Sequence, residues 1–461
     1  MVNAYEQLLA EGYAFSKNGS GTYVSRDSPR AAERDRSISD QPHIGGYRRL
    51  PTYSPALDEL LAFTAHDDER PFSLGRVSLH ENTLQALRKI GYRAFRSVAH
   101  PRHLGYSDPR GIIELREALC EFLYASRGLK CRPEQIVITT GARQGIDLAI
   151  RVLLAPGEKK AWLEDPGHLW TYSALLTAHA DVCAVPVDEQ GMDVEAGIRL
   201  APNAKAVFLK PSHQFPTGVA LSMARRLYLL AWARETGSWI VEDDSGSEFS
   251  YSGRPLPSLQ GLDNDECVIH VGTLNKALFP GLRLGYVVVP HALIQAFTGI
   301  RSLIDTHPST ISQTILAEFI NQGHLAVHIR RMRNRYRDQR DLLATELVRR
   351  VGTAARVQAM DQGTHLVVYL DDAVSDLDVE TAARQNHVTV RALSRLYRAA
   401  PPRSGIILGF TGHQDKAVIA AAERLAGIIR FQSERASDLA RASPMASTSS
   451  VSLAKRTYAE L

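Results

Sequence analysis

The sequence predicts an α/β protein: a mostly parallel sheet with helices on both faces, followed by a smaller α+β domain. Short apolar segments such as QIVITT, KAVFLK, WIVED, VIHVG and LGYVVVP alternate with helical stretches such as GIIELREALCEFLYASRG. Strands of a parallel sheet are covered on both faces, so they read as nearly continuous apolar runs. The length of 461 residues allows two to three domains at roughly 150 residues each.

The first residues carry a small unit of their own. A helix is expected over residues 3–11, followed by two short strands at 13–16 and 22–25. The turn between these strands contains two glycines, which suit a hairpin connection. Residues 26–55 are rich in Arg, Asp, Ser and Pro without apolar periodicity, and they are predicted to be a linker.

The remaining chain is expected to form two domains and a tail. Alternating strands and helices predict a large domain over residues 56–310. Long basic amphipathic helices and the strand-like HLVVYL and GIILGF predict a smaller domain over residues 311–432. The segment 433–461 is rich in Ser and Ala and aperiodic, so it is predicted to be a disordered tail.

Charge and hydropathy argue against several classes of partner. Lys and Arg number 54 against 50 acidic residues, and this net charge of +4 does not favour a nucleic-acid coat or a polybasic membrane surface. No run approaches the roughly 18 apolar residues that a membrane span requires. The N-terminus lacks the layout of a signal peptide, so a cytoplasmic protein is expected.

The cysteines are predicted to be buried, reduced thiols. No CxxC pair and no histidine at metal-ligand spacing accompanies them, and no metal site is expected. They are Cys120, Cys131, Cys183 and Cys267.

Three candidate functional segments follow predicted strands, where open α/β sheets bind their ligands. TTGARQG (139–145) joins a strand to a helix and offers small residues and free N–H groups to an anion. VEDDSGSEF (241–249) places two carboxylates at a strand end, and HVGTLNKALFPGLRLGYVVVP (270–290) places a lysine and an arginine in a loop. Taken singly, the three segments are more typical of an ordinary turn, a helix N-cap and a solvated loop lysine, respectively.

Together, the three segments indicate one cofactor. An anion cradle, a carboxylate pair and a lysine suit a molecule with a phosphate, a basic ring nitrogen and an aldehyde. A desolvated lysine has a lowered amine pKa and forms a Schiff base with an aldehyde. The combination therefore predicts pyridoxal 5′-phosphate (PLP), with Lys276 as the amine.

The sequence resembles the fold type I PLP enzymes, the aspartate aminotransferase superfamily. Within it, the chain is most similar to the catalytic domain of MocR-type members of the GntR regulator family. The resemblance rests on the three segments above and on HLGYSDPRGIIELREAL (103–119), EDPGH (164–168), KPSHQFPTG (210–218) and NKALFPGLRLGY (275–286). It spans residues 100–290 in the family's order and continues more weakly to GIILGF.

The resemblance implies roles for individual residues. Lys276 would hold PLP, and Asp243 would pair with the pyridinium nitrogen so that the ring withdraws electrons. Tyr106 would reach the cofactor phosphate of a neighbouring subunit, which implies a homodimer with shared active sites. His213 and Gln214 would lie near the ring. The groups implied to hold the phosphate are the backbone of Ala142 and Arg143, the Gln144 side chain, Thr273 and Arg283.

Three positions depart from the family's pattern. His168 stands where an aromatic residue, commonly tyrosine, stacks on the ring, and histidine can also move protons. Ser245 replaces a tyrosine that donates to the phenolic oxygen of the ring. Ile407 occupies the nearest position to the arginine that binds a substrate carboxylate in many aminotransferases. The candidate substitutes are Arg391, Arg395 and Arg403.

The expected function is that of a PLP-dependent, aminotransferase-like enzyme acting on an amino acid or amine. Lys276 would remove the Cα proton to give a quinonoid, leading to transamination or to elimination, substitution or cyclisation at Cβ or Cγ in a biosynthetic pathway. The alternative is a MocR-type PLP-sensing regulator. NAYEQLLAEGY and FSKNGSGTYV resemble only the end of a winged helix, so neither DNA nor a membrane is an expected partner.

Overall fold

The structure is a computed structural model. It describes residues 2–25, 55–64, 69–96, 105–154, 157, 159–251 and 257–442. The chain divides into two compact units, one up to Tyr53 and one from Ser54 onward. The linker predicted over 26–55 lies outside the described residues, except for Pro55.

The N-terminal unit contains the predicted helix and hairpin. Helix α1 (Val2–Ala10) precedes strands β1 (Ala14–Lys17) and β2 (Gly21–Val24), which pair antiparallel. Phe15 lies opposite Tyr23, and the two rings stack with centroids 5.8 Å apart. This cross-strand pair stabilises the hairpin.

An eight-stranded sheet forms the centre of the second unit, in the order β3-β10-β9-β8-β7-β4-β5-β6. The strands from β9 to β5 in this order run parallel, and β10 and β6 are antiparallel to their neighbours. This arrangement confirms the predicted mostly parallel sheet. The bounds are β3 (Ile136–Thr139), β4 (Lys160–Asp165), β5 (Asp181–Asp188), β6 (Gly191–Met192), β7 (Ala206–Leu209), β8 (Trp239–Asp243), β9 (Val268–Thr273) and β10 (Gly285–Val288).

Helices cover both faces of this sheet, as predicted, because successive strand residues point to opposite sides. Ile136 and Ile138 pack in a core with α5, whereas Val137 packs in a second core with α6. The helices of this part are α2 (Pro55–Thr64), α3 (Glu81–Arg96), α5 (Ile113–Arg127), α6 (Ala142–Leu153), α7 (Leu169–Thr177), α8 (Val194–Leu200), α9 (Met223–Thr236), α10 (Leu259–Leu262), α11 (Ile294–Asp305) and α12 (Thr310–Asn321).

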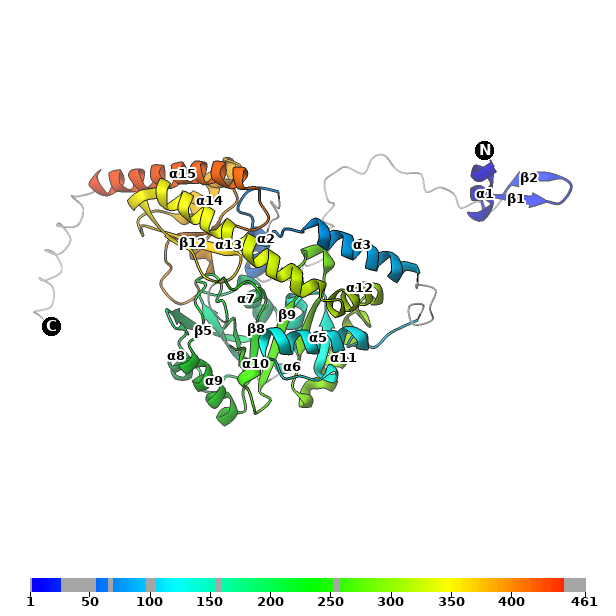
Figure 1. Ribbon diagram of the computed structural model, residues 1–461, viewed down its shortest axis with the longest axis horizontal. Helices are drawn as coiled ribbons and strands as arrows, with labels where there is room; N and C mark the ends of the chain where they lie inside the picture. The colour runs from blue at the N-terminus through cyan, green and yellow to red at the C-terminus, as the bar shows by residue number, and fades with distance from the viewer. Residues whose placement is uncertain are drawn as a thin grey trace, which may run out of the picture. The chain divides into compact units, whose positions relative to one another are not determined.

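A second, antiparallel sheet has the order β11-β12-β14-β13. Helices α13 and α15 lie side by side over it (Figure 1). Leu366 and Val368 of β12 pack under these helices, while Val367 between them belongs to a core that includes Leu169 of α7. The bounds are α13 (His324–Val351), β11 (Ala355–Gln358), β12 (His365–Leu370), α14 (Asp376–Gln385), β13 (Arg391–Ala392), β14 (Gly405–Gly409) and α15 (Asp415–Ala442).

Two predicted boundaries are wrong. The tail predicted over 433–461 does not begin at residue 433, because helix α15 continues to Ala442 and Ala436 packs against the core of the second sheet. Residues 443–461 of the predicted tail lie outside the described residues. The small domain predicted from residue 311 would include α12, yet Leu316 and Phe319 of α12 pack with α5 in the core of the first sheet. Among the residues that the structure describes, no helix combines the length and the apolarity needed to cross a bilayer.

Candidate active site

The predicted functional segments meet in one pocket. A space of about 810 Å³ is lined by Asp243 and Thr273, the last residues of β8 and β9, and by Arg283. It shares His168 and Lys276, among other wall residues, with a cavity of about 240 Å³ that extends to the second sheet. The pocket therefore lies where parallel strands end and bind their ligands.

Lys276 is buried in this pocket, and its amine makes one long hydrogen bond among the described residues. The Nζ atom donates to the carbonyl oxygen of Ser245 at 3.4 Å. Burial, with the nearby charge of Lys210, lowers the pKa of Lys276 to about 8. An appreciable fraction of this amine is therefore unprotonated at neutral pH, as a nucleophilic lysine requires.

Asp243 and Asp244 have separate environments. Burial opposes ionisation of Asp243, but the charges of Lys210 and Lys276 outweigh it and the pKa of Asp243 is lowered. The Asp243 carboxylate also accepts from the backbone N–H of Ser245 at 2.9 Å. Asp244 binds Arg127 instead, through contacts of 2.7 and 2.8 Å. Of these two aspartates only Asp243 lines the pocket, so its carboxylate is the one of the pair that a ligand can reach.

The far end of the pocket is an anion cradle. Gly141 precedes α6 with φ +122°, and no side chain caps the helix N–H groups. A Cβ at Gly141 would lie 2.9 Å from the Asn275 side chain, so the close approach requires glycine. Arg143 and Arg283 line this end, and burial together with the charge of Arg283 lowers the pKa of Arg143. A helix N-terminus and two arginines fit a phosphate.

His168 lies on the pocket wall as the N-cap of α7. Its Nδ1 accepts from the backbone N–H of Trp170 at 3.3 Å, and its ring lies 5.1 Å from that of Phe215. Burial lowers the pKa of His168 to about 3. The imidazole is therefore neutral at neutral pH, with its proton on Nε2.

His213 is a buried side chain without a hydrogen-bond partner in the described part of the chain. It is 3% exposed, lines the smaller cavity, and neither ring nitrogen is satisfied. Its ring lies 5.0 Å from that of His365, and a Cβ at Gly363 would stand 1.9 Å from its Nε2. Glycine at 363 is thus necessary for this position, which offers His213 to a bound group.

The structure separates the three candidate arginines. Arg391 of β13 lines the smaller cavity and pairs in register with Ile407 of β14, so it lies beside the position where an arginine was expected. The other two are not among the residues that line the pocket. Arg395 binds Glu380 at 3.2 Å, and Arg403 lies over the Tyr369 ring at 4.4 Å.

Two predicted cofactor contacts serve the protein's own backbone. The Gln144 carboxamide accepts from the N–H of Thr140 at 2.9 Å, and Gln144 does not line the pocket. Gln214 donates to the carbonyl oxygen of Pro166 at 2.7 Å, so its amide orders the loop around the pocket. Tyr106 is 89% exposed and lies outside the pocket of its own chain, and its predicted contact with a second subunit stays a prediction.

Sequence reasoning missed Lys210 and His365, which both line the smaller cavity. Lys210 follows β7 directly, so the rule that singled out Asp243 at the end of β8 also applied to it. His365 begins β12 of the second sheet, and no local pattern connects that strand with the pocket.

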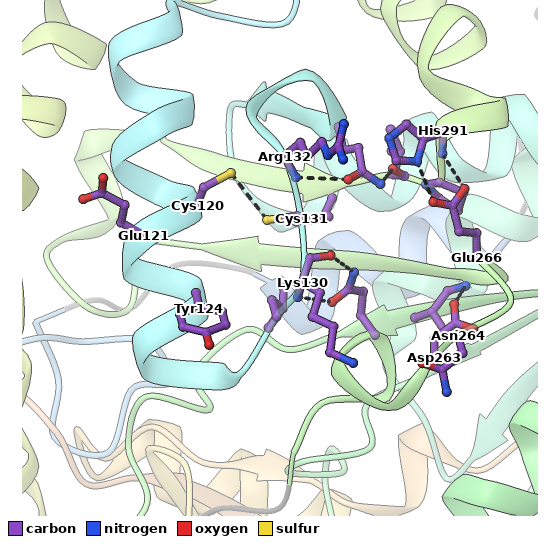
Figure 2. A pocket seen from close by; sticks show the side chains of 17 residues that line it. Cys120, Glu121, Tyr124, Lys130, Cys131, Arg132, Asp263, Asn264, Glu266 and His291 are labelled. Atoms are coloured by element: carbon purple, nitrogen blue, oxygen red, sulfur yellow. Dashed lines mark hydrogen bonds and ion pairs between the residues drawn. The ribbon is translucent and has the colours of Figure 1, made fainter.

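A separate pocket of about 620 Å³ contains the cysteine pair and none of the predicted site residues. Figure 2 shows the thiols of Cys120 and Cys131 pointing toward one another, with their sulfur atoms 3.5 Å apart. Both thiols and that of Cys183 are only half-buried, in contrast to the prediction, and Cys267 is buried. Cys120 is on α5, Cys131 follows that helix, and both pack against the core that contains Ile136 and Ile138.

Regulators and aminotransferases are both similar to this chain. It is 34% identical to a probable rhizopine catabolism regulatory protein, MocR, of Rhizobium meliloti, over 90% of this chain and 83% of that protein. An archaeal alanine:glyoxylate aminotransferase is 25% identical with a TM-score of 0.74, covering 83% of this chain and 96% of that one. A kynurenine aminotransferase of Pyrococcus horikoshii, solved in complex with PMP, is 26% identical with a TM-score of 0.73, covering 82% and 95%.

The family profile described as aminotransferase class I and II matches residues 74–425, which is more than half of the chain. The cofactor is PLP, and the donor set fits it: a reactive lysine amine, an ionised carboxylate and an anion cradle. This chain belongs to the aminotransferase class I and II family.

Proposed function

We propose that this protein is a PLP-dependent, aminotransferase-like enzyme that acts on an amino acid or amine. The observation that carries the proposal is the Lys276 amine, which is buried in the pocket, has a pKa of about 8 and donates to a backbone carbonyl at 3.4 Å. When bound, PLP supplies an electron-withdrawing ring that stabilises negative charge on the substrate carbon bearing the amine. Lys276 accepts and returns the proton at that carbon, and Asp243 keeps a proton on the ring nitrogen.

Substrate carboxylates are assigned to Arg391. This arginine lines the cavity on the side of the second sheet, and the Phe63 ring and Glu380 hold it at 5.8 Å and 3.5 Å. A planar guanidinium at a cavity wall suits bidentate recognition of a carboxylate. The cavity of about 240 Å³ limits the substrate to a small molecule.

Arg391→Leu is expected to raise KM for a carboxylated substrate by about 10- to 100-fold, the value of a charge-assisted hydrogen-bond pair. The effect on KM for the matching amine without a carboxylate is expected to be small. Arg395→Leu is the matched control, since Arg395 also binds Glu380 but does not line the pocket. Equal effects of the two variants on steady-state KM would remove Arg391 from this role.

The reaction is proposed to be transamination, with a route to elimination or substitution at Cβ or Cγ. Ser245 and the neutral His168 both line the pocket, and the Nε2–H of His168 can donate a hydrogen bond to a leaving group. An amino-acid panel tests this proposal by comparing keto-acid formation with leaving-group release. If keto acid and pyridoxamine phosphate are the only products, elimination and substitution are rejected. If no amino acid of the panel is turned over, the proposal that the protein is an enzyme is rejected.

The proposal includes a homodimer. Tyr106 is 89% exposed, and large apolar side chains at Tyr92 and Leu303 are 67% and 81% exposed. A contiguous exposed apolar patch marks a protein interface, and the proposed dimer would bury these side chains in one. Tyr106 would then contact the cofactor phosphate of the partner.

A second candidate is a PLP-sensing transcriptional regulator, favoured by the similarity to the MocR protein of Rhizobium meliloti. The same pocket would then bind an amine as an effector. A gel-shift assay with DNA from upstream of the protein's own gene separates the candidates. Specific DNA binding without turnover of any amine would favour the regulator.

A further inference from the structure

A second lysine lines the smaller cavity, which shares Lys276, His168 and Ser245 with the larger pocket. Lys210 directly follows β7, next to Asp243 at the end of the neighbouring strand β8. Its side chain is 8% exposed, and its Nζ lies 3.6 Å from Asp243 Oδ1 and 3.2 Å from Ser245 Oγ. Nζ also donates to the carbonyl oxygens of Asp243 and Ser245. These contacts hold the ammonium at one place in the pocket.

Burying this ammonium is costly unless hydrogen bonds and opposite charges compensate for its lost hydration. The carboxylates near this ammonium are Asp243 and Glu164, and the Glu164 carboxylate accepts from the Lys210 backbone N–H at 3.0 Å. Burial raises the pKa of Glu164 to about 8, so Asp243 is the main source of negative charge here. The pocket also contains other charged or titratable groups: Lys276, His168, His213, His365, Arg143 and Arg391.

The Lys210 ammonium lies beside Ser245, one of the positions where this sequence differs from the family's pattern. The family resemblance implies a tyrosine at this position, whose hydroxyl would donate to the phenolic oxygen of PLP. Serine is too short to replace it, but its hydroxyl contacts the Lys210 ammonium. Lys210 and Lys276 also donate to the same carbonyl oxygen, that of Ser245, so the two amines converge.

We propose that Lys210 contacts the cofactor and supplies to its phenolic oxygen the hydrogen bond that tyrosine supplies in the related proteins. The proposal rests on PLP being held by Lys276. A cationic donor at this place stabilises the negative phenolic oxygen and repels the proton on the nitrogen attached to Lys276. A lysine that only neutralised Asp243 would not be replaceable by a tyrosine at position 245.

The test is a pH titration of the visible absorption of the PLP-loaded protein. Lys210→Met is expected to raise the midpoint by about one pH unit or more, because a nearby positive charge is removed. Lys210→Met combined with Ser245→Tyr is expected to return the midpoint toward the wild-type value. Lys130→Met, at an exposed lysine of the pocket in Figure 2, is the matched control and leaves the midpoint unchanged.

An unchanged midpoint in Lys210→Met would overturn the proposal. A raised midpoint that Ser245→Tyr does not restore would also overturn it, since Lys210 would then act on Asp243 alone. If Lys210→Met does not fold, Lys210→Gln keeps a donor without the charge and is expected to raise the midpoint by less than a unit. Absence of any visible band in the wild-type protein would instead contradict the proposed function, so the two failures are distinguishable.

Discussion

Replacing Lys276 with alanine is expected to abolish the visible absorption that the protein acquires with PLP and to remove all turnover. The reason is that, in the proposed function, Lys276 provides both the amine that carries the cofactor and the proton acceptor at the substrate carbon. Among the described residues that line the pocket and the smaller cavity, the only lysine besides Lys276 is Lys210. Its Nζ already makes four polar contacts, so it does not replace Lys276. The measurement is an absorption spectrum of the purified variant after saturation with PLP.

Chemical mapping provides the control for this experiment. Reduction of the loaded wild-type protein with borohydride, followed by peptide mass spectrometry, is expected to place the cofactor on Lys276. Lys210→Met is expected to retain the visible band, with a displaced pH midpoint. A band that persists in Lys276→Ala, or a label found on Lys210, would reassign the cofactor-bearing lysine.

Arg127→Met is expected to reduce the free energy of unfolding by about 3–5 kcal/mol, the cost of breaking a buried ion pair. Arg127 and Asp244 are 7% and 2% exposed in their side chains, and two hydrogen bonds join them. Ser212 and Ser247 donate to the same carboxylate at 2.9 and 2.7 Å. Without Arg127, the carboxylate stays buried without a cation at hydrogen-bond distance, and denaturant unfolding monitored by circular dichroism measures the loss.

An exposed ion pair provides the matched control for Arg127→Met. Arg151 binds Asp147 at 2.8 Å on the surface of α6, with the arginine side chain 55% exposed. Arg151→Met is expected to change the free energy of unfolding by less than about 1 kcal/mol. A loss in Arg127→Met no larger than that in Arg151→Met would contradict the assigned role of the buried pair.

The same pair predicts acid sensitivity. Burial opposes ionisation of Asp244, yet Arg127 and His270 lower its pKa to about 2. A carboxyl whose folded pKa lies below its unfolded value contributes stability above the unfolded pKa and loses it as pH falls through the folded pKa. This carboxyl therefore contributes about 2 kcal/mol at neutral pH, and the contribution disappears between about pH 4 and pH 2.

The pocket was predictable to the extent that it lies on one parallel sheet. Carboxyl ends of parallel strands meet at one edge, so Asp243, Thr273 and the cradle after β3 had to come close together once the strands were identified. Lys276 was predicted for the same reason, because it follows the end of β9 by three residues. Strands β4 and β5 were not predicted, since β4 carries charged residues at both ends and β5 is exposed at both ends.

Contacts that depend on side-chain reach or on the second sheet were not predictable. Gln144 and Gln214 belong to motifs of the family, but their amides satisfy backbone groups that only the folded loops reveal. The start of the tail was predicted too early for a similar reason, because Ala436 is a poor hydrophobic signal in sequence and a packed residue in the structure.

The sequence by itself determined the fold class, the cofactor and the lysine that would hold it, because periodicity and strand ends are local properties of the chain. Only the tertiary structure decided that Arg391 is the arginine at the cavity and that Lys210 reaches Ser245. The first depends on the register that pairs β13 with β14, and the second on the adjacency of β7 and β8. Register and strand order depend on which faces of the strands are buried across the whole sheet, and this cannot be deduced from a short segment of sequence.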